Sequence, residues 1–207
     1  MNARFQSDKV KQKKHHKRTA IIEAAIETFA KKGFHKTKIS DIARAADVAD
    51  GTVYLYFDNK DDLLIKSFDE LISGKLNELK KLVEGEETFL ARLTMFFDYH
   101  VKLFTEKPYI ARFMAIELRQ STEFYKKFPD YQPIKRYLNY LQELIDEAKK
   151  EGNLRDVDTL GLSYLMFGTM DFVLTEWSTR EQSFDLLDIK DKIVDIVRYG
   201  MYPIREH

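Results

Sequence analysis

The chain has 207 residues, of which 44% are hydrophobic and 33% charged, a composition typical of a soluble globular protein with one or two domains. It contains no cysteine, which excludes disulfides, thiolate metal sites and thiol catalysis and fits a reducing compartment. No apolar run approaches the roughly 20 residues of a membrane span, and no signal peptide is recognisable. We therefore expect a cytoplasmic protein that does not associate with a membrane.

The formal net charge of zero conceals two parts of opposite sign. Residues 1–60 carry 13 Lys/Arg and 7 Asp/Glu, whereas the remaining residues carry 21 and 27. A basic first third is the electrostatic footprint of a polyanion-binding module, and an acidic remainder is repelled by the same polyanion. The two parts are therefore expected to have different partners.

Helical periodicity continues through nearly the whole chain, so the predicted fold class is all-α. Residues 1–17 are polar and basic without an apolar period and predict a flexible arm. Helices are expected over 18–32, 38–46 and 50–57, followed by a fourth that ends near 83. Five more are expected over 87–105, 108–122, 133–151, 158–180 and 186–202. These nine helices predict a three-helix N-terminal module, which the fourth helix joins to a larger helical domain.

The second and third predicted helices have the proportions of a helix-turn-helix. At 100° per residue, Val53 and Phe57 share one face that can be buried, and the opposite face points outward. In this motif the second helix presents its outer face to the DNA major groove. Glycine allows close approach, a threonine hydroxyl binds phosphate or base edges, and leucine contacts thymine methyl groups. The predicted DNA-facing residues are Gly51, Thr52, Tyr54, Leu55 and Tyr56.

Lys60 adds a separate indication of a DNA partner. A cation in the first turn of a helix opposes the helix dipole, and a bound phosphate would explain it. The alternative is a solvated lysine paired with Asp61 and Asp62.

The run TKISDIARAADVADGTVYLYFDNKDDLL, residues 37–64, resembles the TetR family of bacterial transcriptional regulators. The resemblance covers the helix-turn-helix, the aromatic run and the following lysine. It implies a DNA-binding domain over 18–64 and a ligand-binding and dimerisation domain over 65–207. It also implies a homodimer bound to a palindromic operator in double-stranded DNA. It also implies that Ala49 stands where the family commonly has a Ser or Thr N-cap. By resemblance, phosphate contacts are expected from Thr37, Lys38, Ser40, Thr52, Tyr54, Tyr56 and Lys60.

Two segments of the C-terminal part, IELRQSTEFY (116–125) and MFGTMDFVLTEW (166–177), are similar to the acyl-CoA-responsive repressors of fatty-acid degradation within that family. The effector implied is a long-chain acyl-CoA, which needs an apolar tunnel and a cation at its mouth. Aromatic residues are numerous on these helices, and they line either an ordinary core or such a tunnel. The candidate wall residues are Phe97, Phe113, Met114, Met166, Met170 and Trp177.

Arg119 is the candidate phosphate ligand, because a charge in a partly buried segment needs a partner. Pairing with Glu117, Glu123 or Asp171 is the alternative, and it would go with an uncharged hydrophobic drug or metabolite as effector. His100, alone on an aromatic helix, is expected to be a hydrogen-bonded core residue rather than a metal ligand, and no metal or cofactor is predicted. In the last helix, apolar residues cover more than one face. Together with the resemblance, this predicts dimerisation through the last two helices, and the alternative is a helix buried on both sides within one subunit.

The sequence lacks the P-loop, G-x-G-x-x-G, G-x-S-x-G and H-E-x-x-H motifs and a cysteine nucleophile, so an enzyme is not expected. A helical scaffold without DNA affinity is the other class to weigh. Retention by DNA separates a regulator from a scaffold, and turnover of an acyl-CoA would separate an enzyme from both. The prediction is a transcriptional repressor released from its operator by its effector.

Overall fold

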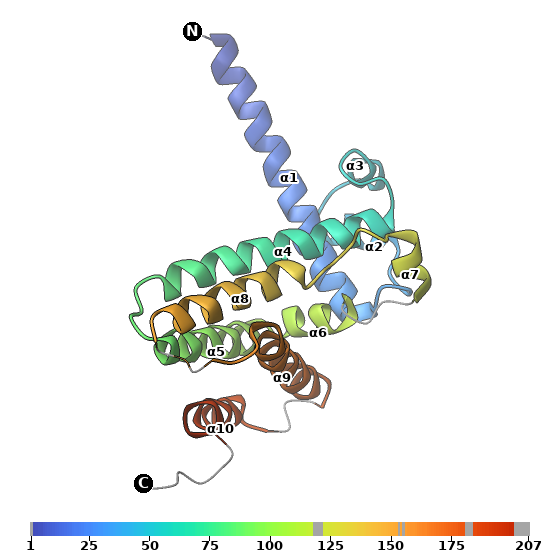
Figure 1. Ribbon diagram of the computed structural model, residues 1–207. Helices are drawn as coiled ribbons and strands as arrows, with labels where there is room; N and C mark the ends of the chain where they lie inside the picture. Colours follow the sequence, from blue (N-terminus) through green and yellow to red (C-terminus); the bar gives the residue numbers. More distant parts are fainter. Residues whose placement is uncertain (1, 118–121, 153, 155, 181–183, 201–207) are drawn as a thin grey trace, which may run out of the picture. The chain divides into compact units, whose positions relative to one another are not determined.

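The computed structural model describes residues 2–117, 122–152, 154, 156–180 and 184–200. Within these ranges the chain forms ten α-helices and no β-strand (Figure 1), which confirms the all-α prediction. The chain divides into two compact units. The first comprises Met1–Leu71 and Ile116–Tyr131, and the second comprises Ile72–Ala115 and Gln132–His207. None of the helices in the described ranges is long and apolar enough to span a membrane.

The first unit is built around the helix-turn-helix. It contains α1 (Asn2–Lys32), α2 (Ile39–Ala45), α3 (Asp50–Tyr54), the first half of α4 (Lys60–Val83) and α7 (Thr122–Lys127). The short helix α2 packs against both α1 and α3. The core of the first unit includes apolar side chains with no exposed surface: Ile21, Ala25, Phe29, Ile42, Val53, Leu63, Leu64 and Phe68. The apolar stripe of each helix therefore fixes where α3 is held.

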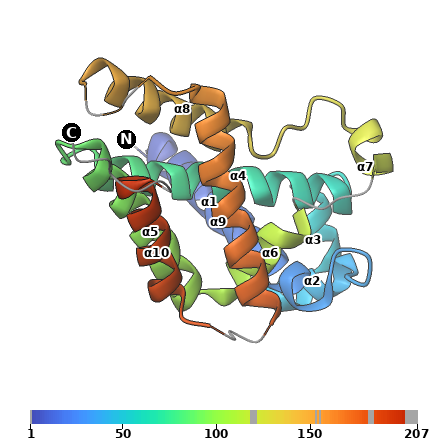
Figure 2. The same cartoon turned by 60° about the horizontal axis from the view of Figure 1, so that its bottom comes forward.

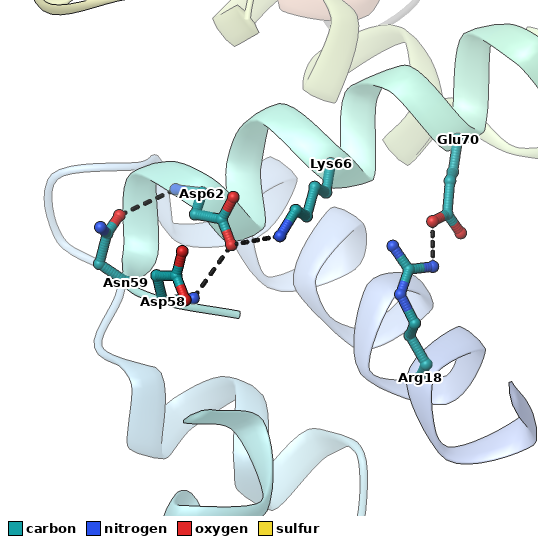
Figure 3. Close-up of polar contacts among 6 residues, drawn as sticks. All are labelled: Arg18, Asp58, Asn59, Asp62, Lys66 and Glu70. Carbon is teal, nitrogen blue, oxygen red and sulfur yellow. Dashed lines mark hydrogen bonds and ion pairs between the residues drawn. The ribbon is translucent and has the colours of Figure 1, made fainter. Parts of the chain in front are cut away.

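The first turn of α4 is fixed by side chains that satisfy its free backbone groups (Figure 3). Asn59 caps the helix, since its side-chain oxygen accepts a hydrogen bond from the Asp62 N–H at 2.9 Å. The Asp62 carboxylate accepts the Asp58 N–H at 3.0 Å and pairs with Lys66 at 2.8 Å. This reciprocal capping ends the loop after α3 at a defined point.

Arg18 connects α1 to α4. Its guanidinium pairs with Glu70 (Figure 3) and lies over the ring of Phe57, 5.4 Å from the ring centroid. The segment that follows α3 is therefore held between the two longest helices of this unit.

Residues 2–17, for which the sequence predicted a flexible arm and no helix, are helical, because α1 begins at Asn2. The described side chains among residues 9–17 are exposed, so no apolar stripe marks them as helical. The stretch contains no Gly or Pro, however, and is rich in lysine, a good helix former. A helix already nucleated by the buried part of α1 can therefore extend through it at low cost.

The second unit contains α5 (Phe89–Glu106), most of α6 (Pro108–Glu117), α8 (Lys135–Lys150), α9 (Thr159–Thr179) and α10 (Leu186–Tyr199). The helix α9 packs on α8, and α10 lies beside α5, as Figure 2 shows. Side chains cap three of these helices: Thr88 accepts the Ala91 N–H, Asp158 the Gly161 N–H and Asp185 the Leu187 N–H. The fully buried core includes Leu79, Leu93, Phe96, Phe113, Leu141 and Ile145.

Nine helices were predicted, whereas ten form in the described ranges, and α7 is the addition. The predicted helix over 108–122 is replaced by α6, which ends at Glu117, and by the six-residue α7; residues 118–121 lie outside the described ranges. Phe124 of α7 packs in the first unit, where its ring centroid lies 6.5 Å from that of Phe34 and 6.1 Å from that of Tyr131. Fewer than two turns of helix give too short a period to be recognised in a sequence.

Candidate nucleic-acid interface and effector cavity

The turn between α2 and α3 sets the angle of the helix-turn-helix. Asp47 has a φ of 52°, and in the described ranges it is the one non-glycine residue in the left-handed region, which Asp tolerates better than most residues. Its N–H donates to the Arg44 carbonyl at 3.3 Å, and the Val48 N–H donates to the Ala43 carbonyl at 2.9 Å. These bonds satisfy the last carbonyls of α2 and direct the chain into α3.

The two faces of α3 differ as its sequence predicts. Val53 and Phe57 are buried, with 0% and 1% of their surface exposed, which confirms the inner face. Leu55 is 77% exposed and Tyr54 55% exposed. Gly51 is exposed as well, and Thr52 and Tyr56 are half-buried. All five predicted contact residues therefore lie within one short segment with exposed surface.

Ala49 is the N-cap of α3 and has an extended backbone but no side-chain capping bond. The negative charge of Asp50 in the first turn offsets part of this loss through the helix dipole. An N-terminus without a side-chain cap leaves backbone N–H groups of α3 available to an anion.

The residues predicted to bind phosphate near the start of α2 differ in their exposure to solvent. Thr37 is 2% exposed, and its hydroxyl donates to the Gly33 carbonyl at 2.8 Å, at the end of α1. Lys38 is exposed, and its backbone N–H donates to Asp41 at 3.1 Å. Ser40 is half-buried and lines an open hollow beside the turn. Lys38 and Ser40 thus have surface accessible to solvent, whereas Thr37 has almost none.

Within the protein, Lys60 binds backbone carbonyls rather than Asp61 or Asp62. Its ammonium group donates to the carbonyls of Phe34 at 2.8 Å and Thr37 at 3.0 Å, and lies 4.4 Å from the centroid of the Phe34 ring. The neighbouring Asp61 pairs with Lys127 of α7. Lys60 therefore joins α4 to the loop between α1 and α2, and these two bonds use two of the three N–H donors of its ammonium group.

Two adjoining cavities lie in the second unit and share Val101 and Leu186. The outer one is an open cavity of about 540 Å³ lined by α5, the end of α9 and the start of α10, and it includes Lys102 and Trp177. The inner one measures about 20 Å³ and is lined by Phe97, His100, Val101, Met170, Val173, Leu174, Leu186, Lys190 and Ile193. The outer cavity thus has a cation in its wall, and the inner one is lined mainly by apolar side chains.

The predicted wall residues are divided between these cavities and the core. Phe97 and Met170 line the inner cavity, and Trp177 lines the outer one. Phe113 and Met166 are buried and Met114 is half-buried, and none of the three lines either of these two cavities. Arg119 lies outside the described residues. No pattern in the sequence pointed to Lys102, or to Lys190, whose charge is balanced by Asp98 and Asp191 at 2.7 Å each.

His100, beside the inner cavity, is a hydrogen-bonded core residue, as predicted. Its Nδ1 lies 2.6 Å from the Phe96 carbonyl oxygen, which only accepts, so Nδ1 carries the proton. Nε2 then accepts the hydroxyl of Tyr137. Burial lowers the pKa of His100 to about 4, and it raises that of Tyr137 well above its usual value. In the described ranges no group of His, Asp and Glu side chains is arranged to hold a metal ion.

This neutral pair predicts a loss of stability in mild acid. The histidine of an unfolded chain has a pKa of about 6.5, so between that pH and about 4 the unfolded state binds more protons than the folded one. The free energy of unfolding is therefore unaffected above pH 6.5 and falls by about 1–3 kcal/mol as the pH drops through this window. Denaturant unfolding at pH 7, 6 and 5 measures it.

Replacing the pair together, His100→Leu with Tyr137→Phe, should flatten the dependence between pH 7 and 5, because no buried polar group is left unpaired. The control His35→Gln, at an exposed histidine, should retain it. An equally steep loss in the double variant would show that other groups cause it.

Two family models match the chain in succession. Residues 21–66 match bacterial regulatory proteins of the tetR family, and residues 68–200 match the C-terminal region of YsiA-like proteins. The second match alone covers more than half of the chain. The chain belongs to the TetR family of bacterial regulatory proteins. It is a DNA-binding transcriptional regulator, which confirms the function predicted from the helix-turn-helix and places it outside the enzymes.

Relatives of this TetR-family chain include regulators of fatty-acid metabolism. It is 32% identical to the fatty acid metabolism regulator protein of Bacillus subtilis over 88% of this chain and 94% of that protein. Its fold is similar to that of FadR from Bacillus subtilis in complex with stearoyl-CoA, with a TM-score of 0.81 and 31% identity over 89% of this chain and 99% of that one. FadR from Bacillus halodurans is similar to the same degree, with a TM-score of 0.81 and 33% identity over the same shares. These likenesses confirm the resemblance found in residues 116–125 and 166–177.

Proposed function

We propose that this regulator is a cytoplasmic repressor that binds a palindromic operator as a homodimer and is released when a long-chain acyl-CoA enters the second unit. The observation that carries the effector is the likeness, over 89% of the chain, to a regulator whose structure holds stearoyl-CoA. The acyl-CoA acts as an effector and not as a cofactor, because it shifts an equilibrium between two states without undergoing a reaction.

On the DNA side, the outer face of α3 supplies the base contacts. Leu55 is the most exposed large apolar residue of the chain's described part, and contact with a thymine methyl group would remove it from water. Lys38 and Ser40 supply phosphate contacts from the start of α2. Thr37 and Lys60 support these helices through the carbonyls that they bind, and so act by positioning rather than by contact.

The homodimer forms through α9 and α10. Both helices contribute to the core, yet each exposes large apolar residues along another face, and a helix that is apolar on two faces needs a second partner. A two-fold axis pairs this face with its own copy in a four-helix arrangement, and it sets two recognition helices about 34 Å apart for successive major grooves. The exposed residues are Leu160, Tyr164, Leu165 and Phe172 of α9 and Leu187, Ile196 and Tyr199 of α10.

The cavities of the second unit suggest how an acyl chain shifts the equilibrium. The inner cavity, at about 20 Å³, has room for one water molecule and is far too small for a long acyl chain. An acyl chain that enters beside Met170 must displace side chains of α5, α9 and α10, and it therefore stabilises a different packing of these helices. The exposed Lys102 at the outer cavity is available to the phosphates of the CoA, and Arg119 remains a candidate for the same role.

The segment around α7 is the proposed link to the DNA-binding helices. It belongs to the first unit and follows α6 directly in the chain, and most of α6 belongs to the second unit. Figure 1 shows α7 beside the start of α4, where Lys127 pairs with Asp61 and Phe124 contacts Phe34. Because Phe34 also carries the carbonyl and ring bound by Lys60, a displacement of α7 acts on the contact that joins α4 to the α1–α2 loop.

The test is release of an operator fragment, selected from random duplexes with the protein itself, by oleoyl-CoA, free oleate or CoA. We expect oleoyl-CoA alone to lower DNA affinity, by about 5–150-fold, which is the usual range of allosteric coupling. Met170→Trp, which fills the inner cavity, should abolish the response, and Leu82→Trp, on exposed surface of α4, should not.

Release by oleate as well as by oleoyl-CoA would show that the CoA phosphates are not needed and would identify a fatty acid as the effector. If oleoyl-CoA changes neither DNA affinity nor the melting temperature, the acyl-CoA assignment is wrong and the DNA-binding function stands by itself.

A further inference from the structure

The positive charge of the DNA-binding unit is concentrated outside its helix-turn-helix. Residues 1–18 hold seven Lys/Arg and one Asp, whereas residues 19–60 hold six Lys/Arg and six Asp/Glu. The segment that contains α2 and α3 is thus formally neutral. Attraction to phosphates supplies most of the sequence-independent affinity of DNA-binding proteins, and a segment without net charge contributes little to it beyond local contacts such as those of Lys38.

The first part of α1 carries this charge on exposed side chains. Lys9, Lys13 and Lys17 recur at every fourth residue and so share one face of the helix, and Lys14 extends the charge to another face. All four are exposed. Residues 9–22 contain no Asp or Glu, and Arg18, the next cation after Lys17, pairs with Glu70 of α4.

This arrangement lacks a folding role in the described residues. Like charges four apart on a helix repel one another, and the exposed lysines bury no apolar surface that would compensate. The family match begins at residue 21, beyond this segment. A polyanion would convert the repulsion into attraction, because phosphates neutralise the lysines and release their own counterions.

The position of the segment favours DNA as that polyanion. Within the first unit, α1 packs against α2, which in turn packs against the recognition helix α3. At 1.5 Å per residue, residues 9–18 extend about 14 Å along the helix axis. The charged segment is therefore continuous with the helix that supports the recognition surface.

We propose that residues 9–17 of α1 form a second DNA-binding surface, which contacts phosphates beside the site read by α3 and does not read sequence. Its lysines supply the salt-dependent affinity and the rapid association that the neutral helix-turn-helix lacks. The outer face of α3 then supplies the choice of operator.

The test measures binding of the full-length protein to a mixed-sequence 30-base-pair DNA duplex between 50 and 200 mM KCl. In the variant Lys9→Gln, Lys13→Gln, Lys14→Gln, Lys17→Gln, the slope of log affinity against log salt should become shallower by about 0.9 for each phosphate that the protein no longer neutralises. For two to four such phosphates the affinity at 50 mM KCl should fall by about tenfold or more. The melting temperature should not change, because the four side chains are exposed.

The matched control removes the same charge from four exposed lysines of the second unit: Lys81→Gln, Lys107→Gln, Lys135→Gln and Lys150→Gln. Its slope should remain close to that of the unaltered protein, and arginine at the four α1 positions should retain the steep slope. Equal slopes in the two quadruple variants would overturn the proposal. So would a reduction confined to duplex RNA, or a reduction confined to the selected operator.

Discussion

The double variant Leu165→Glu, Phe172→Glu in α9 is expected to be monomeric and to bind the operator about 10²–10⁴-fold more weakly than the unaltered protein. Each of the two original side chains is 63% exposed, although both are large and apolar and lie seven residues apart on one face. Four buried carboxylates across a two-fold interface would carry a desolvation cost without partners. A monomer engages one half-site and so loses the effective concentration that links the two recognition helices.

Sedimentation velocity gives the mass, and fluorescence anisotropy with the operator gives the affinity. Leu82→Glu, at another exposed apolar residue on α4, is the control that should remain dimeric. Because the α9 residues face away from the core, the melting temperature of the monomer reports only the lost association. A double variant that still sediments as a folded dimer would place the interface elsewhere.

The helix-turn-helix is predictable from its sequence because the burial of α3 follows from helical period alone. Val53 and Phe57 are four apart, and both are buried as expected. The hydrogen bonds of Lys60 to backbone carbonyls, in contrast, could not be predicted from the sequence. The carbonyls of Phe34 and Thr37 point toward Lys60 because of the conformation of the loop between α1 and α2. The spacing of residues in the sequence does not determine the direction in which a loop carbonyl points.

For the proposed effector-binding residues of the second unit, burial was likewise predictable and membership of a cavity wall was not. The aromatic composition predicts that Phe97, Met170 and Trp177 are buried, and they are. Which buried residues surround space depends on packing between helices far apart in the sequence, so Phe113 and Met166 could not be distinguished in advance from residues of the cavity wall. The extended α1 escaped prediction for the opposite reason, because its first part is helical without burial in the described residues.

Phe124→Ala is expected to uncouple effector binding from DNA release, which depends on the function proposed above. Phe124 is 8% exposed and packs against Phe34, Phe128 and Tyr131, all in the first unit. Truncating a buried phenylalanine to alanine costs about 3–5 kcal/mol, here at the attachment of α7 to the DNA-binding helices. Once α7 is loosely attached, a movement of α6 in the second unit no longer shifts the equilibrium between the two states of the DNA-binding helices.

The measurement is the affinity for oleoyl-CoA with and without operator DNA, because coupling free energy is reciprocal between the two ligands. In the unaltered protein the two affinities should differ by the same factor by which oleoyl-CoA lowers DNA affinity. In Phe124→Ala that factor should approach one, while the affinity for oleoyl-CoA in the absence of DNA is retained. Phe89→Ala makes the same truncation at a buried residue of the second unit and should lose stability while it keeps the coupling. If Phe124→Ala retains the full factor, the signal reaches the recognition helices through α4 instead, since α4 is the other helix that the two units share.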